Sequence, residues 1–377
     1  MFNHDPLEEW LLFAKNRTSA AYKPNVTDNA QLELLQHRLA DAPTGKVTYD
    51  DLTFNRYTTT LRSPQELALA QDLYMWVWER GGTGVSTILD NLLSIIAFAQ
   101  APTAIPFLQR LLDLRKAHEP GAEGRRISTL AALALLVLTA NNAEAYTALV
   151  KALDHTNEQV RTFAGYYLGQ IQLRQERAPS DAVIAALRQC ATKGSVFLPR
   201  YQAQVTLWLL HAPLPREFPA GVYHLKVWFR WSKREPSRTI AICANQTLAR
   251  LHVAIQEAFD WDADHLYSFY MNGERGTTLF NIICPQLDES VMPYYKRKRD
   301  PTTTKTAAVY TLTTETCIGD LGFQLKDSFL YFFDYGDNHE FEVSVVAIQP
   351  EADAGTYPRV TEIIGMSPDQ YPGAEEE

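Results

Sequence analysis

The spacing of the apolar residues changes once along this 377-residue chain, at residues 212–221. Before this segment, apolar residues recur every three or four positions, which is typical of helices; after it they alternate, which is typical of strands. The segment reads Ala-Pro-Leu-Pro-Arg-Glu-Phe-Pro-Ala-Gly, and its three prolines fit neither a helix interior nor a central strand. We therefore expect an all-α region and an α+β domain, joined by a Pro-rich linker at 212–221.

An internal repeat organises the helical region, residues 63–211. When Arg126, Arg161 and Arg200 are aligned, a small residue follows three positions later and aliphatic residues follow seven and ten positions later. Each copy follows another apolar helix, expected at 106–114, 145–154 and 181–190. Small residues let paired helices approach closely, and the aliphatic positions form a shared core. The repeat positions are Thr129, Ala164 and Ala203, then Leu133, Leu168 and Leu207, then Leu136, Ile171 and Leu210.

The copy at 157–171, Asn-Glu-Gln-Val-Arg-Thr-Phe-Ala-Gly-Tyr-Tyr-Leu-Gly-Gln-Ile, resembles a HEAT repeat. That family's pattern has Val-Arg, then a small residue, then Leu-Gly. The resemblance implies a HEAT-like α-helical solenoid over 63–211, with arginines that bond loop carboxylates and carbonyls; an irregular helical bundle is the alternative. Ser63 and Pro64 are a good helix start. Residues 1–62 form an expected N-terminal helical segment, with helices at 5–20 and 27–39.

Alternating residues predict strands at 223–231, 238–243 and 265–271, and a hairpin over 328–347. Thr247 can cap a helix whose apolar residues recur at helical spacing up to Phe259. Residues 328–335 are apolar on both faces, so this strand belongs at the centre of a sheet, and 336–338 would form the turn after it. An insertion at 272–316 and an extended stretch after Pro350 complete a mixed sheet with one main helix, an α+β, β-grasp-like domain at 222–373. An acidic tail at 374–377 follows.

Three blocks in residues 223–373 carry a further resemblance. The first is Thr-Leu-Ala-Arg-Leu-His-Val-Ala-Ile-Gln-Glu-Ala-Phe-Asp-Trp at 247–261 with Asp-His-Leu-Tyr-Ser-Phe at 264–269; the second is Phe-Asp-Tyr-Gly-Asp at 333–337; the third is Tyr-Pro-Arg-Val at 357–360 with Gly-Met-Ser-Pro-Asp-Gln-Tyr-Pro at 365–372. Their order and spacing resemble the plasmid pRiA4b ORF-3-like family. The resemblance implies an α+β domain of bacterial, plasmid and mobile-element proteins, without an activity.

Two departures from that family bear on chemistry. His339 stands where the family often has tryptophan. Val360 and Tyr371 stand where some members carry a cysteine pair, so a metal role for those cysteines does not apply. The four cysteines, Cys190, Cys243, Cys284 and Cys317, are scattered and form no CxxC pair. This pattern indicates reduced thiols in a cytoplasmic protein.

A polar cluster at the hairpin turn is the first candidate site. Its carboxylates and imidazoles can bind a divalent cation or act as acid and base; the alternative is turn chemistry, with structural histidines. The candidate residues are Asp334, Asp337, His339 and Glu340, with His252 and His265 from other blocks.

Two further patterns suggest binding surfaces. Trp228, Arg230 and Trp261 can line a groove for a peptide or a stacked base, or they pack in the core and on the sheet. The basic run can contact phosphates, or it is a solvated loop. It consists of Lys296, Arg297, Lys298 and Arg299.

Function follows from what is present and what is missing. The chain has no P-loop, GxGxxG, GxSxG or HExxH motif. Its net charge of -9 disfavours unaided binding to nucleic acid, and its longest apolar run, 130–138, is far short of the ~20 residues that span a bilayer. We expect a non-enzymatic binding or adaptor protein with a protein partner, no cofactor and no membrane. The alternatives are a metal-dependent enzyme acting on nucleic acid at residues 334–340, and a nucleic-acid-binding protein that uses the basic run.

Overall fold

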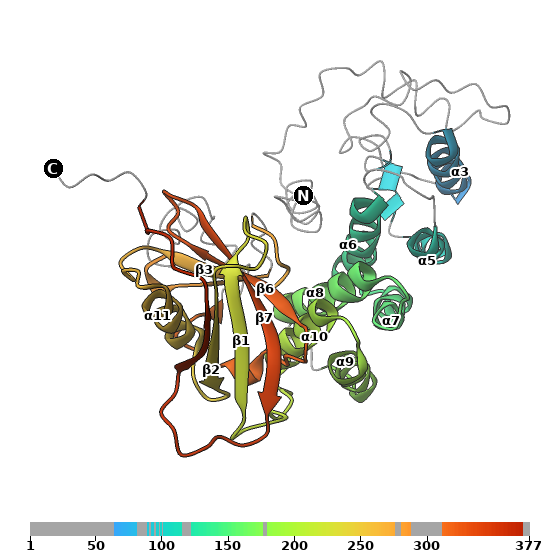
Figure 1. Ribbon diagram of the computed structural model, residues 1–377. Helices are drawn as coiled ribbons and strands as arrows, with labels where there is room; N and C mark the ends of the chain where they lie inside the picture. Colours follow the sequence, from blue (N-terminus) through green and yellow to red (C-terminus); the bar gives the residue numbers. More distant parts are fainter. Residues whose placement is uncertain are drawn as a thin grey trace. The chain divides into compact units, whose positions relative to one another are not determined.

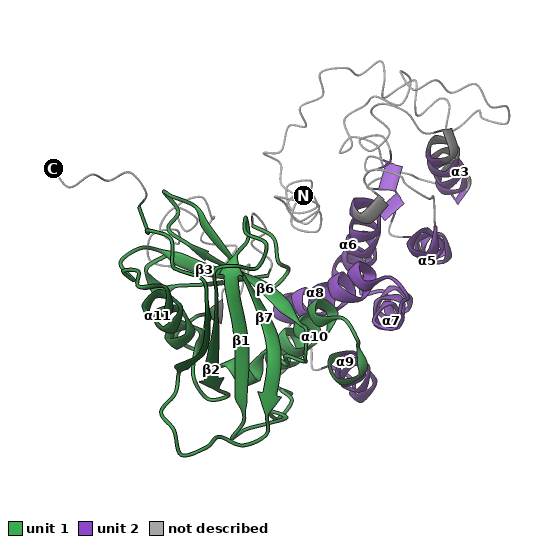
Figure 2. Ribbon diagram, viewed as in Figure 1, with its two compact units in different colours: residues 1, 191–377 green, residues 2–190 purple. Residues whose placement is uncertain are grey.

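The computed structural model describes residues 64–80, 101–114, 122–175, 179–275, 280–287 and 311–371, with several positions between 89 and 99. The chain divides into two compact units, and the division falls between residues 190 and 191 (Figure 2). The helices expected at 5–20 and 27–39, the acidic tail and the basic run at 296–299 lie outside the described residues. The linker limits 212–221 stay a prediction.

The described part of the first unit is helical (Figure 1). The helices expected at 106–114, 145–154 and 181–190 are present, and the helix expected from Pro64 begins there. Helices α5 to α8 pack on one another, and the repeat positions of α6 and α8 are buried, as Thr129 and Ala164 illustrate. The elements are α3 (Pro64–Arg80), η2 (Pro102–Ala104), α5 (Ile105–Asp113), α6 (Ala122–Ala140), α7 (Ala143–Ala152), α8 (Glu158–Gln175) and α9 (Asp181–Lys193), which crosses into the second unit.

The repeat arginines bond the backbone between two helices. Arg126 donates from Nη2 to the carbonyl of Leu114, 3.1 Å away, just after α5. Arg161 donates from Nη1 to the carbonyl of His155 at 2.7 Å, in the loop between α7 and α8. Arg200, at the same repeat position, donates to the carbonyl of Gly194 at 3.2 Å. These hydrogen bonds confirm the expected role of the arginines, which is to bond loop carbonyls. The bonds stabilise the fold because a buried carbonyl without a donor is costly.

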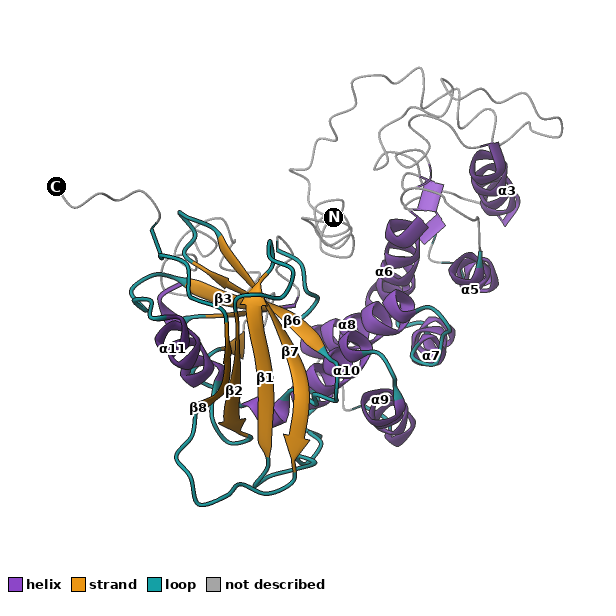
Figure 3. Cartoon of the chain, in the orientation of Figure 1, coloured by secondary structure: helices purple, strands orange, loops and turns teal. Residues whose placement is uncertain are grey.

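The second unit is built on one eight-stranded sheet, in the order β5-β4-β3-β6-β7-β1-β2-β8. Figure 3 labels strands β1, β2, β3, β6, β7 and β8 of this sheet. Neighbouring strands are antiparallel, except that β4 and β5 are parallel. The elements are α10 (Phe197–Leu209), β1 (Val222–Phe229), β2 (Ser237–Cys243), α11 (Leu248–Phe259), β3 (Tyr267–Tyr270), β4 (Asn281–Ile283), β5 (Thr311–Leu312), η4 (Ile318–Asp320), β6 (Ser328–Phe333), β7 (His339–Gln349) and β8 (Arg359–Ile364).

The core of this unit lies between the sheet and α11. Thr247 caps α11 by accepting a hydrogen bond from the amide of Arg250, as the sequence predicts. Phe259 of α11 packs against Phe229 of β1, with 5.1 Å between ring centroids. Strand β6 is fourth in the sheet, and its apolar residues 329–333 have no exposed surface. Its predicted central position is therefore confirmed, since a strand covered on both faces carries apolar side chains on both.

Several expectations need correction. Strand β8 was missed and expected as an extended stretch, because its Arg359, Thr361 and Glu362 are polar edge-strand residues. The hairpin turn expected at 336–338 is present, but the residues with left-handed backbone are Asp334 (φ 55°) and Asn338 (φ 61°), not Gly336. Asp and Asn tolerate this conformation because they bond local backbone. The first strand ends at Phe229, so Trp231 lies beyond it and is 72% exposed.

Candidate functional site

The turn between β6 and β7 brings Asp334 and His265 together. Asp334 accepts hydrogen bonds at Oδ1 from the amides of Gly336 (2.8 Å) and Asp337 (3.3 Å). Its Oδ2 lies 3.1 Å from Nε2 of His265, in the α11–β3 connection. A hydrogen bond with the backbone of Asp264 raises the pKa of His265, and the charge of Asp334 adds to this effect. The contact ties the turn to the neighbouring loop, and it is an ion pair when His265 is protonated.

The other predicted members of the polar cluster are arranged differently. His339 packs edge-on against Trp261, 4.7 Å between ring centroids, and burial lowers its pKa although Asp334 and Asp337 oppose this. Glu340 is the next residue of β7, so its side chain points to the opposite face of the sheet. There its Oε2 lies 3.4 Å from Nη1 of Arg230. Across the described residues, no group of three His, Cys, Asp or Glu side chains can hold a metal ion. The cluster is therefore split by the alternation of β7.

His252 lies in the core of the α11 side. Its ring stacks on Tyr267, with 3.6 Å between centroids and an interplanar angle of 7°. The hydroxyl of Tyr331 accepts a hydrogen bond from Nε2 of Gln256 and lies 2.7 Å from Nδ1 of His252. Burial lowers the pKa of His252 to about 4, so the imidazole is neutral at pH 7 and accepts the hydroxyl proton. Its position matches the structural alternative, away from Asp334.

The expected groove of Trp228, Arg230 and Trp261 is not formed. Trp261 is 8% exposed and packs against Phe229 in the core, with its Nε1 donating to the carbonyl of Pro368 at 2.9 Å. Trp228 and Arg230 flank Phe229 in sequence, so they point to the other face of the sheet. The three side chains therefore lie on two faces, and the core interpretation of Trp261 is confirmed.

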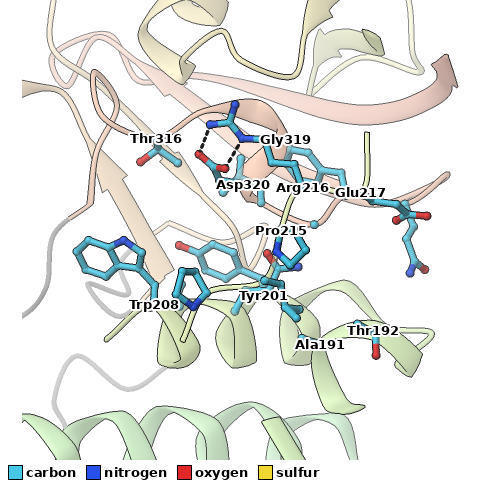
Figure 4. A pocket seen from close by; sticks show the side chains of 18 of the residues that line it. Ala191, Thr192, Tyr201, Trp208, Pro215, Arg216, Glu217, Thr316, Gly319 and Asp320 are labelled. Atoms are coloured by element: carbon cyan, nitrogen blue, oxygen red, sulfur yellow. Dashed lines mark hydrogen bonds and ion pairs between the residues drawn. The ribbon is translucent and has the colours of Figure 1, made fainter. Parts of the chain in front are cut away.

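A pocket of about 600 Å³ lies within the second unit, and the sequence did not predict it (Figure 4). One wall is α10, which contributes Tyr201 and the exposed Trp208. A second wall is the segment after α10, which contains Pro213 and Pro215. The third wall is residues 315–324, around η4. A volume of this size is in the range of binding sites in proteins, so this pocket is the candidate functional site.

One bidentate ion pair fixes the polar part of the pocket. Arg216 donates from Nε and Nη2 to the two carboxylate oxygens of Asp320, at 2.5 and 2.9 Å (Figure 4). These hydrogen bonds raise the pKa of Arg216, so the guanidinium stays charged. Tyr201 lies at the floor, 5% exposed, and burial raises the pKa of its phenol, so it is neutral at pH 7. The bidentate pair therefore holds the Pro-rich segment against η4.

The floor of the pocket continues the core of the sheet. Phe323 stacks on Phe329 of β6, with 5.0 Å between ring centroids and an interplanar angle of 12°. The ring of Phe323 also packs against Phe197, the first residue of α10, with 5.0 Å between ring centroids. Gly322, with φ +65°, lets residues 321–324 turn past Gln204 of α10, where a Cβ atom would lie only 1.8 Å from Nε2. The walls are thus held by packing, and the pocket is a fixed feature of this unit.

The second unit resembles a known protein family. The second unit is an α+β domain with α11 on an eight-stranded sheet. The model of the family described as plasmid pRiA4b ORF-3-like protein matches residues 221–373, so the predicted resemblance is confirmed for that part of the chain. A solved structure of a protein of unknown function, MM3350 from Methanosarcina mazei Go1, is 26% identical over 38% of this chain and 69% of that chain, with a TM-score of 0.27. No curated protein matches the chain.

Among the described residues, none of the helices combines the length and the apolar character needed to cross a bilayer.

Proposed function

We propose that the chain is a non-enzymatic binding or adaptor protein of the cytoplasm, in which a HEAT-like helical scaffold precedes a β-grasp-like recognition domain. The observation that carries the proposal is the pocket of about 600 Å³ beside α10, with the half-exposed Trp208 in its wall. Exposed aromatic side chains next to a concave surface are typical of protein recognition sites. The protein takes a segment of a partner protein in this pocket.

The helical region supports the scaffold part of this proposal. Arg126 and Arg161 make the same type of bond to the backbone of the helix connection before them. A repeated side chain with a repeated partner indicates repeated helix pairs, and stacked pairs present extended surfaces to partners. The mobile-element association of the resembled family is compatible with an adaptor of bacterial origin, and it assigns no partner.

The test is peptide selection against three versions of the full chain. A phage library of random peptides is selected on the wild type and on Trp208→Ala, with Trp231→Ala as the matched control, since Trp231 is an exposed tryptophan that does not line the pocket. We expect enriched peptides that bind wild type and Trp231→Ala and lose binding to Trp208→Ala. The proposal would be overturned if the enriched peptides bind Trp208→Ala as well as wild type, or if no peptide is enriched.

A further inference from the structure

The charges around the pocket are unbalanced. Among the described residues, its lining contains one basic side chain, Arg216, and three acidic ones, Glu217, Glu315 and Asp320. Arg216 makes two hydrogen bonds to Asp320, so these two charges offset each other. Two negative charges then remain in the lining. A pocket with this balance repels an anionic ligand and attracts a cationic one.

The two remaining carboxylates, Glu217 and Glu315, are exposed. Within the described ranges, neither side chain forms an ion pair or a hydrogen bond. Burial raises the pKa of Tyr223 in the pocket wall, and the charge of Glu217 adds to the increase. The field of Glu217 therefore reaches into the pocket. A cation placed there gains the attraction of this carboxylate without first breaking an ion pair.

The pocket lining also contains apolar and aromatic side chains. Trp208 is 58% exposed, and in Figure 4 its indole and the Glu217 side chain lie at opposite ends of the view. The buried Leu321 and Phe323 belong to the same lining. An indole face binds apolar groups by burial and cations through its ring electrons. The pocket lining thus offers an exposed indole at Trp208 and, apart from it, the carboxylate of Glu217.

We propose that the pocket binds a basic peptide segment, in which an apolar side chain packs on Trp208 while a nearby lysine or arginine pairs with Glu217 or Glu315. This inference rests on the proposed function and adds the chemistry of the partner. A peptide fits better than a free small molecule, because Pro213, Pro215 and Glu217 in the walls are exposed. Small-molecule sites bury ~70–90% of their ligand, whereas a side chain carried by a larger partner needs less enclosure.

The experiment uses three peptides with blocked ends: Ac-Gly-Phe-Gly-Lys-Gly-NH2 and its analogues with norleucine or glutamate in place of lysine. Binding to the full chain is measured by saturation-transfer NMR, which detects weak complexes. We expect the lysine peptide to bind about threefold to fivefold more tightly than the norleucine peptide, the size of a partly exposed ion pair. The advantage should disappear in Glu217→Gln/Glu315→Gln and at high salt, because salt screens exposed charges.

Glu351→Gln is the matched control, since Glu351 is exposed and does not line the pocket; it should keep the full preference. Trp208→Ala should weaken all three peptides, because they share the phenylalanine. Equal binding of the lysine and norleucine peptides, with loss in Trp208→Ala, would overturn the charge inference and leave the proposed function standing. Preference for the glutamate peptide, or no binding by any of the three, would overturn the charge inference, and the phage selection then decides the proposed function separately.

Discussion

Arg200 and Asp327 lie 127 residues apart in the chain and form a buried ion pair that joins α10 to the sheet. Arg200 has no exposed surface, and its Nη1 also donates to the carbonyl of Gly194. Asp327 accepts a hydrogen bond at Oδ2 from the amide of Gln324, 2.6 Å away. Arg200 therefore bonds both the connection before α10, at Gly194, and the loop before β6, at Asp327.

Breaking this pair should be costly. We expect Asp327→Asn to lower the free energy of unfolding by about 3–5 kcal/mol, because the buried Arg200 would lose the carboxylate that faces it. Urea unfolding of the full chain measures the loss. The double variant Arg200→Met/Asp327→Leu should lose less than the sum of the single variants. The exposed pair Arg216–Asp320 is the control, where Asp320→Asn should cost about 0–1 kcal/mol; equal losses at both sites would contradict the argument.

His252 makes stability depend on pH. Its pKa is lowered to about 4 by burial, whereas an unfolded histidine has a pKa of ~6.5. Between these values the unfolded state binds more protons than the folded state, so stability is complete above pH 6.5 and falls as the pH falls toward 4. The loss from this residue should approach ~3 kcal/mol. Urea midpoints at pH 7 and pH 4.5 measure it, and His252→Gln should flatten the difference.

His265 should titrate in the opposite direction. Its pKa is raised by the hydrogen bond with the Asp264 backbone and by the charge of Asp334. The stability that this charge contributes is present below pH 6.5 and is lost as the pH rises through the raised pKa. NMR titration of the imidazole signals should place His265 above the ordinary histidine value and His252 below it. In Asp334→Asn, the His265 signal should move down in pKa while the His252 signal stays unchanged; the reverse pattern would refute the assigned contacts.

Gly322 and Gly273 separate backbone strain from steric contact. Both have positive φ, +65° and +70°, but a Cβ at Gly322 would meet Nε2 of Gln204 at 1.8 Å, while at Gly273 nothing lies within 4 Å. Gly273→Ala should cost about 1 kcal/mol from the left-handed backbone alone. Gly322→Ala should cost a similar amount by thermal unfolding, because the atoms that the new Cβ meets are the end of the flexible Gln204 side chain, which can shift. A larger loss at Gly322 that Gly322→Ala/Gln204→Ala recovers would contradict this and show that Gln204 is held in place.

Local patterns were sufficient to predict most individual elements. Helix α11 was readable from Thr247 and the spacing up to Phe259, and β6 from its run of apolar residues. These signals are local, because capping and hydrophobic period depend on neighbours in sequence. Strand β8 was not predicted, because its residues Arg359 and Glu362 lie in an edge strand, where side chains need not be apolar.

The candidate sites were harder to predict from the sequence than the helices and strands. Trp261 and Trp228 looked alike as exposed-groove candidates, and only the pairing of β1 placed them on opposite faces. His339 and Glu340 are adjacent in sequence and were expected in one cluster, but strand alternation points them apart. The pocket has walls from residues 191–223, 282 and 315–324, and no local pattern links such segments.

Side-chain spacing along single segments was sufficient to predict helices α5 to α11, strands β1, β2, β3, β6 and β7, and the central place of β6. It did not predict β8, or β4 and β5 inside the 272–316 insertion. The tertiary structure decided which distant residues meet: Arg200 with Asp327, Arg216 with Asp320, and Trp208 with the loop at η4. These contacts depend on the order of the strands in the sheet and on the packing of α10. Both are set by the total burial of the fold and not by any single stretch of sequence.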